Sequence, residues 1–325
     1  MKKTYYFIFL TLFVFFSCGD MENVIDLEVP PHEPVLVLNG IFSTDDTASV
    51  TISHSVGPFD SNIPSYLPNA EVLLYKDNML IDTMKPDLTD MIAVEYIDSD
   101  YNTGTIDMFY YKSSHIAEKN NTYRVEVNHP NLASVSASTY LPADVNLFNI
   151  DVDTNTALND GKVNFRFSFN DDPGIDNYYQ LRVFASCVKE YDDYYGYYDE
   201  WIFSEELEIL SNDPSFPSSG IPFEGYAFAG YSVLFTDDLF NGQQKDISFD
   251  VNVEDDWSYS KCDTVIFEFS TFSDDTYSYF NSLDLHVEKG PVGIFGGEVV
   301  PVYSNVQDGL GVLMSNNMQR VFLKP

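Results

Sequence analysis

Basic side chains are scarce in this sequence. Its 325 residues contain 16 lysines and arginines against 51 aspartates and glutamates, which gives a formal net charge of -35 at pH 7. Such an acidic surface repels phosphate groups and offers few cations that could displace their counterions. Nucleic acid is therefore excluded as a partner.

Cysteine and histidine are also few, with three and five residues. No C-x-x-C pair and no cysteine–histidine cluster occurs, so the sequence argues against a zinc site. Cys187 and Cys262 both lie in segments with the composition of strands. In an exported protein these two thiols can form a disulfide, and they can equally remain as separate buried thiols. The sequence leaves both alternatives open.

No apolar run is long enough for a comfortable transmembrane helix. The most apolar segment, residues 5–16, is shorter than the roughly 20 residues that such a helix needs. It follows Lys2 and Lys3 and ends just before Ser17 and Cys18. This order predicts a lipoprotein signal peptide over residues 1–17, whose removal leaves Cys18 as the lipidated residue. An ordinary cleaved signal is the alternative, but no A-x-A-like sequence lies nearby to favour it.

The rest of the chain is acidic and yet able to form a core. Hydrophobic residues make up 44% and aromatic residues 16% of the sequence, unlike the composition of disordered acidic chains. Residues 18–33 combine acidic residues with prolines and predict an extended, lipidated tether. The remaining length predicts two domains, residues 34–142 and residues 143–325.

Residues 34–142 show short apolar stretches that alternate with polar residues, separated by turn sequences such as Asn39-Gly40 and Asp77-Asn78. Four of the expected strands are residues 35–38, 49–53, 71–75 and 123–127. About seven strands in roughly a hundred residues are typical of an immunoglobulin-like or transthyretin-like β-sandwich.

Residues 143–325 continue the alternation. Expected strands cover residues 163–169, 178–183, 247–253 and 265–269. Residues 274–287 predict one short helix, because apolar residues recur every three or four positions behind a cap at residues 274–276. The fold class is therefore all-β, with a second antiparallel sandwich or barrel-like domain that carries the helix.

Several motifs together resemble a known family. They are PPHEPVLVLNG at residues 30–40, PNAEV at residues 68–72, DNYYQLR at residues 176–182, DTYSYFNSL at residues 275–283 and PVYSNVQDGLG at residues 301–311. Their order and spacing resemble lipoproteins of domain-of-unknown-function family 4249 from Bacteroidota. The resemblance covers nearly all of the chain after the signal peptide, although each motif alone is weak.

The resemblance implies a location and a partner rather than a reaction. Members of the family that the chain resembles are two-part, β-rich lipoproteins that are often encoded beside a TonB-dependent outer-membrane transporter. We therefore expect an accessory subunit in nutrient uptake, held on the outer membrane by its lipid and facing the exterior. Acidic residues behind Cys18 resemble surface-export signals, although a generic polar linker would look the same. The rival expectation is a free-standing glycan-binding or adhesion lipoprotein.

The most unusual segment is EYDDYYGYYDEWIF at residues 190–203. It interleaves acidic residues with aromatic ones, which are Tyr191, Tyr194, Tyr195, Tyr197, Tyr198 and Trp201. Such rings make good contacts with proteins or sugars, and their grouping around Gly196 predicts a hairpin tip that contacts a glycan, a peptide or a protein partner. The alternative is a twisted hairpin whose rings pack on the domain's own sheet.

No arrangement typical of an enzyme or of a cofactor site stands out. The histidines are far apart, and no H-E-x-x-H or G-x-S-x-G sequence is present. Acidic pairs are so common that a two-carboxylate glycosidase site cannot be recognised by sequence. Residues 151–155 and 171–176 could wrap Ca²⁺, but neither completes an EF-hand, and solvated turns are the favoured interpretation. We therefore expect no enzymatic activity and no cofactor.

The C-terminal segment at residues 299–313 is expected to be structural. The pattern predicts a strand that includes Val299, a turn at residues 305–309, and a return to the sheet at Val312 and Leu313. Gly309 and Gly311 would supply the backbone freedom for this path. The functional alternative is that Tyr303 and Asn305 bind a ligand at the mouth of a loop.

Overall fold

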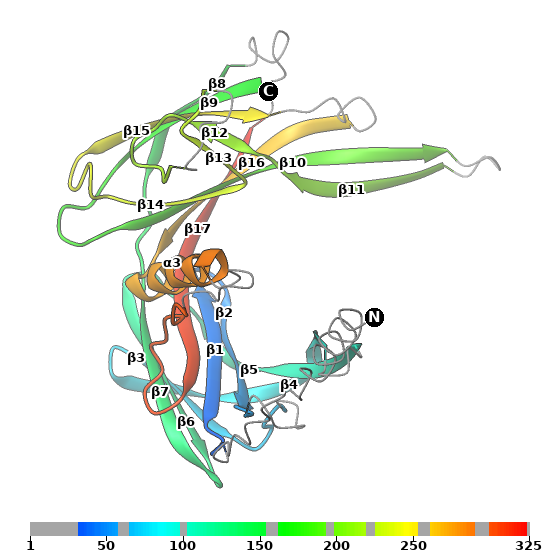
Figure 1. Ribbon diagram of the computed structural model, residues 1–325, viewed down its shortest axis with the longest axis vertical. Coiled ribbons are helices and arrows are strands. Elements are labelled where there is room, and N and C mark those ends of the chain that lie inside the picture. The colour runs from blue at the N-terminus through cyan, green and yellow to red at the C-terminus, as the bar shows by residue number, and fades with distance from the viewer. Residues whose placement is uncertain are drawn as a thin grey trace, which may run out of the picture. The chain divides into compact units, whose positions relative to one another are not determined.

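A computed structural model describes residues 32–57, 65–97, 103–153, 162–192, 198–218, 225–252, 261–289 and 299–323. Residues from Pro34 to Pro325 form one compact unit, and Met1–Glu33 are a separate unit. The described elements are β-strands except for one long helix, as expected from the alternation in the sequence (Figure 1). Within these ranges, no helix has the length and the apolar character that a membrane span requires.

The first seven strands form a β-sandwich. They are β1 (Leu36–Ser43), β2 (Thr47–His54), β3 (Glu71–Lys76), β4 (Met79–Ile97), β5 (Thr103–Ile116), β6 (Asn121–His129) and β7 (Leu132–Leu141). One layer has the order β1-β2-β5-β4 and the other has β3-β6-β7, with β4 pairing to β5 and also to β3. This is the strand order of the seven-stranded immunoglobulin sandwich, so the expected first fold is confirmed.

Alternation along each strand places one face in the core. Leu36 and Leu38 on β1 are fully buried, as are Val125 and Val127 on β6. Val37 and Glu126, which lie between them, are partly exposed to solvent. A side-chain period of two is therefore sufficient to assign the inner and outer faces of this sandwich.

Tyr123 at the start of β6 makes a contact that recurs in immunoglobulin-like domains. Its ring is fully buried, and its hydroxyl oxygen accepts a hydrogen bond of 2.8 Å from the backbone N–H of Glu118, five residues upstream. A tyrosine at this corner, bonded back to the preceding loop, is a hallmark of the fold. The contact fixes the turn between β5 and β6.

Replacing Tyr123 with phenylalanine is expected to lower the free energy of unfolding by about 1–2 kcal/mol, because the N–H of Glu118 loses its acceptor. Chemical denaturation measures the change. Tyr140→Phe is the control, since the Tyr140 hydroxyl donates to Asn120 at the surface with a distance of 3.2 Å. Equal effects of the two substitutions would contradict a special role for Tyr123.

The second sandwich follows β7. One of its sheets has the order β13-β12-β15-β9-β8. These strands are β8 (Leu147–Asp153), β9 (Lys162–Asn170), β12 (Ile209–Ser211), β13 (Phe228–Gly230) and β15 (Gln244–Asn252). The facing layer contains β10 (Tyr178–Asp192), β11 (Tyr198–Glu206), β14 (Ser232–Thr236) and β16 (Lys261–Phe272).

Phenylalanine dominates the core between these layers. Phe167 on β9 stacks on Phe267 of β16 with ring centroids 5.6 Å apart, and it meets Phe269 edge-on at 5.4 Å. Tyr179 on β10 meets Phe169 of β9 edge-on at 5.0 Å. These ring pairs connect the two sheets and show that the second part is a sandwich.

The last strand, β17 (Leu310–Leu323), belongs to both halves of the unit. Its first half pairs in parallel with β1, and its second half pairs antiparallel with β16, with Asn316 at the crossover. Leu313 packs in the first core, whereas Val321 and Leu323 pack against the second. The two cores are thus joined through one continuous sheet, and the division at residues 142/143, which falls between β7 and β8, stays a prediction.

The long helix, α3 (Asp274–Lys289), follows β16 as expected, but its cap differs from the prediction. The N-cap residue is Ser273, whose hydroxyl oxygen accepts from the N–H of Thr276 at 3.2 Å. The aspartates at positions 274 and 275 lie in the first turn, where negative charge stabilises the helix dipole.

The segment before β17 partly contradicts the sequence-based expectation. Val299 is 85% exposed and no strand forms at residues 299–306, so the predicted strand there is wrong. The reason is that side-chain bonds rather than a ladder hold this segment. The Asn305 amide nitrogen donates to the carbonyl oxygens of Ser138 and Leu313, and its side-chain oxygen accepts from the N–H of Leu313. Val312 and Leu313 are buried in β17 as predicted.

Candidate functional site

The predicted lipidation residue, Cys18, lies outside the described residues, as do the signal peptide and most of the tether. Their role therefore stays a prediction from sequence. The other predicted site residues fall in the second sandwich and are described next.

Cys187 is fully buried on β10 and is disulfide-bonded. The register of β10 with β16 places Cys262 directly opposite it, at a point where the ladder shifts by one residue. Cross-strand neighbours are close enough for their side chains to interact. The backbone arrangement therefore favours Cys262 as the bridging residue.

We expect peptide mapping without reductant to recover a fragment that links Cys187 to Cys262. Such a bridge would stabilise the second sandwich by about 2–4 kcal/mol, because it restricts the unfolded chain. Recovery of both residues as free thiols from oxidised protein would contradict this prediction. The difference in unfolding free energy between the oxidised and the reduced wild type measures the contribution of the bridge. The double variant Cys187→Ser/Cys262→Ser, compared with the reduced wild type, controls for the loss of the thiols themselves.

The described residues of the aromatic segment lie on two paired antiparallel strands, β10 and β11. Tyr194, Tyr195 and Tyr197 lie outside the described residues. Tyr191 pairs with Asp199, and Tyr198 pairs with Asp192, so both tyrosines lie on antiparallel strands that lead to this tip. Trp201 lies on β11 opposite Lys189. The two paired strands of the predicted hairpin are therefore present, while its tip and the contacts of its rings stay a prediction.

The acidic loop at residues 171–176 is held by the protein's own donors. The Asp171 carboxylate accepts hydrogen bonds from the Tyr179 hydroxyl at 2.5 Å and from the N–H of Gly242 at 2.7 Å. Burial, followed by the nearby charge of Asp171, raises the pKa of Asp237 beside it, although hydrogen bonds from Asn177 act in the opposite direction. Nowhere in the described ranges do three or more potential metal ligands come together.

The histidines are not brought together either. His54, His115, His129 and His286 each contact other residues through a ring nitrogen. These partners are Ser55 and Ser65 for His54, Tyr123 for His115, Asn69 for His129 and Val300 for His286. Nε2 of His54 lies 3.0 Å from the Ser65 hydroxyl, which is within the reach of a base for a nucleophile. Ser65 is exposed, and the other ring nitrogen of His54 contacts the carbonyl oxygen of Ser55 rather than a carboxylate.

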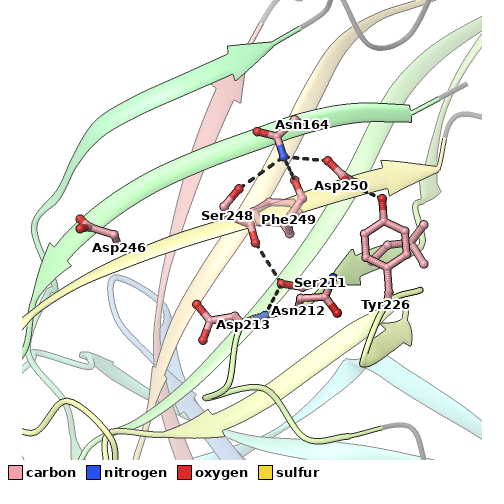
Figure 2. A pocket seen from close by; sticks show the side chains of 10 residues that line it. Asn164, Ser211, Asn212, Asp213, Tyr226, Asp246, Ser248, Phe249 and Asp250 are labelled. Carbon is pink, nitrogen blue, oxygen red and sulfur yellow. Dashed lines mark hydrogen bonds between the residues drawn. The ribbon is translucent and has the colours of Figure 1, made fainter. Parts of the chain in front are cut away.

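A polar groove lies on the outer face of the second sandwich, where β9, β15 and the end of β12 meet (Figure 2). It has a volume of about 350 Å³ and is lined by Asn164, Leu210, Ser211, Asn212, Asp213, Tyr226, Asp246, Ser248, Phe249 and Asp250. The strand period explains this composition, because Val163 and Phe165 point into the core while Asn164 points outward.

Hydrogen bonds among the lining residues organise the polar groove. The Asn164 amide nitrogen donates to a carboxylate oxygen of Asp250 at 2.7 Å, and the Tyr226 hydroxyl donates to the other oxygen (Figure 2). Lys245 is bonded to Asp213 at 2.7 Å. Most polar atoms of the groove are therefore already engaged with one another.

A hydrogen bond from the Ser168 hydroxyl, and a further one from Gln244, lower the pKa of Asp246 in this groove. A general acid near neutral pH needs a shift in the opposite direction. Asp246 is therefore poorly suited to act as a general acid in this groove. Sequence reasoning missed the groove, since alternation shows which residues point outward but not which strands are neighbours.

A comparison with known protein families shows which family the chain belongs to. The family described as "Domain of unknown function (DUF4249)" matches residues 22–320. The chain belongs to this family. The DUF4249 match includes both sandwiches and the shared strand β17, so the family region corresponds to nearly the whole compact unit. No curated protein matches the chain.

Proposed function

We propose that this DUF4249 protein is an outer-membrane lipoprotein that serves as an accessory subunit of a TonB-dependent transporter and takes part in nutrient capture or uptake. It acts by binding rather than by catalysis. The lipid on Cys18 holds it at the membrane, and the two sandwiches present surfaces to the transporter and to the nutrient.

The sequence of residues 1–18 supports the membrane attachment. Two lysines, an apolar segment and a cysteine follow one another in the order of a lipoprotein signal. Stable attachment requires at least two acyl chains, which lipoprotein processing supplies. The tether of residues 18–33 would then separate the folded unit from the lipid.

The observation that carries the partner contact is the ribbon formed by residues 189–192 and 198–201. β10 pairs with β16 as far as Val188, but its pairing with β11 continues to Asp192 (Figure 1). Within the described residues, these last pairs have no third strand beside them. A two-stranded ribbon with free edges and an aromatic sequence is a favourable element for contact with another protein.

Membrane attachment is tested with Cys18→Ala. The variant is expected to move into the soluble fraction after cell lysis, because it loses about 0.8 kcal/mol for each buried methylene group of its acyl chains. Cys187→Ser, which replaces a cysteine in the folded unit, is the control and should stay with the membrane. A Cys18→Ala protein that remains fully membrane-bound would contradict lipidation.

The partner contact is tested by purifying the tagged protein from its own membranes in mild detergent. The triple variant Tyr191→Ser/Tyr198→Ser/Trp201→Ser is expected to co-purify with far less transporter while its unfolding midpoint changes little. Phe322→Ser is the control, because Phe322 is an exposed aromatic residue on β17 with 63% exposure. Co-purification of no transporter by the wild type would favour the free-standing binding lipoprotein instead.

A further inference from the structure

A larger cavity lies beside α3 and is separate from the polar groove. Its volume is about 830 Å³, within the range of small-molecule sites. Helix α3 forms one wall, and β10 and β14 form another, so the strands and the helix converge on one space. We call it the helix cleft.

Aromatic side chains from α3 and the neighbouring loop line the helix cleft. Tyr277 stacks on Tyr178 with centroids 4.4 Å apart, and Phe280 stacks on Phe272 at 5.8 Å. These neighbours hold the two helix rings in place. Tyr231 is 58% exposed and lines the cleft from the strand side. The cleft therefore offers rigid aromatic surface that ligand atoms can contact at low entropic cost.

Unpaired polar groups lie on the same side of the helix. Asn281 and Asp284 are four and seven residues beyond Tyr277, so the three share one helical face, and all line the cleft. Asn281 and Asp284 are exposed, and neither side chain has a hydrogen-bond partner in the described part of the chain. They offer an amide donor, an amide acceptor and a carboxylate acceptor to a ligand.

The charges of the helix cleft exclude anions. Among the described residues that line it, the one basic residue is Arg182, which is bonded to Glu206 at 2.7 Å and lies 3.8 Å from Glu268. Asp284 adds a negative charge without a cation beside it, in a protein whose formal net charge is -35. A wholly apolar ligand would also be disfavoured, because it would remove the polar groups from water without replacing their hydrogen bonds.

We propose that the helix cleft binds a neutral oligosaccharide. The C–H faces of sugar rings pack on aromatic rings, and their hydroxyl groups bond to the Asn281 amide and the Asp284 carboxylate. This inference rests on the proposed function, since it assigns the chemical class of the captured nutrient. The cavity volume of about 830 Å³ accommodates several sugar units, and none of these contacts requires a charge on the ligand.

The test is an array of neutral oligosaccharides of two to six sugars, printed beside uronate-containing oligosaccharides and tripeptides rich in lysine and arginine. The full folded chain is expected to bind neutral glycans only. Calorimetry with the tightest-binding neutral glycan then compares the wild type with Asn281→Ala/Asp284→Ala and with Tyr231→Ala. Each variant should bind at least about tenfold more weakly, the loss expected for about 1.4 kcal/mol of ligand contacts.

Glu288→Ala is the matched control, because Glu288 is an exposed carboxylate on α3 outside the cleft lining. It should bind the glycan as the wild type does, and all variants should keep the same unfolding midpoint. Binding of peptides or acidic glycans instead, no binding of any neutral glycan, or glycan binding that the cleft variants leave unchanged would each overturn the proposal. Co-purification with the transporter is measured on the same variants and should be retained, which separates this inference from the proposed function.

Discussion

Substituting Gly311 with alanine is expected to destabilise the protein by about 4 kcal/mol or more, or to prevent its folding. Gly311 has a φ of 106° and lies opposite Leu38 in the parallel pairing of β17 with β1. A Cβ atom at this position would lie 2.1 Å from the carbonyl oxygen of Leu38 and 2.8 Å from Oδ1 of Asn39. The substitution would therefore impose backbone strain and also force β17 away from β1.

The control for this prediction separates the two causes. Gly225 also has a positive φ, of 91°, but a Cβ atom there would meet no atom of the described residues within 4 Å. Gly225→Ala should therefore cost only the backbone strain, about 1–2 kcal/mol. Urea denaturation of both variants gives the comparison. If Gly311→Ala lowered the free energy of unfolding no more than Gly225→Ala does, the result would contradict the close approach of β17 to β1.

Substituting Phe167 with alanine is expected to lower the free energy of unfolding by about 3–5 kcal/mol. Phe167 is 1% exposed and contacts rings of both sheets of the second sandwich, including Phe249 and Phe267. Its removal leaves a cavity between layers that are each held by their own ladders, so the surroundings can collapse only in part. Thermal and chemical unfolding measure the loss.

Phe322→Ala is the control for this second prediction. Phe322 lies on β17, which also borders the second core, but its side chain is 63% exposed. The change should stay within about 0.5 kcal/mol of the wild type. A loss from Phe167→Ala as small as this would contradict the assignment of Phe167 to the core.

Because β17 joins both cores, we also expect the Phe167→Ala protein to unfold in a single transition.

Local patterns were sufficient for much of the fold. Alternation at residues 163–169 predicted β9 and its buried face, and spacing at residues 274–287 predicted α3. The error at Val299 has a physical reason, because a short apolar stretch looks like a strand whether or not a neighbour can pair with it. Asn305, which holds that segment through bonds to Ser138 and Leu313, carries no local sign of those distant partners.

The functional sites were less accessible to sequence reasoning. The aromatic segment could be predicted as a contact site because its composition is unusual over consecutive residues, and this role stays a prediction. The helix cleft was not, because its lining comes from Tyr231 on one segment, Arg182 on another and Asn281 on a third. None of these residues lies in a stretch of unusual local composition.

The sequence by itself determined the all-β class, the faces of most strands, the helix and the acidic surface, because each follows from side-chain periodicity or composition within a short window. Only the tertiary structure decided that β17 joins both sandwiches, that Gly311 must lack a Cβ atom, that Tyr123 closes its corner and that α3 forms a cleft with β10 and β14. These features depend on atoms that are far apart in sequence and meet only after the sheets have assembled.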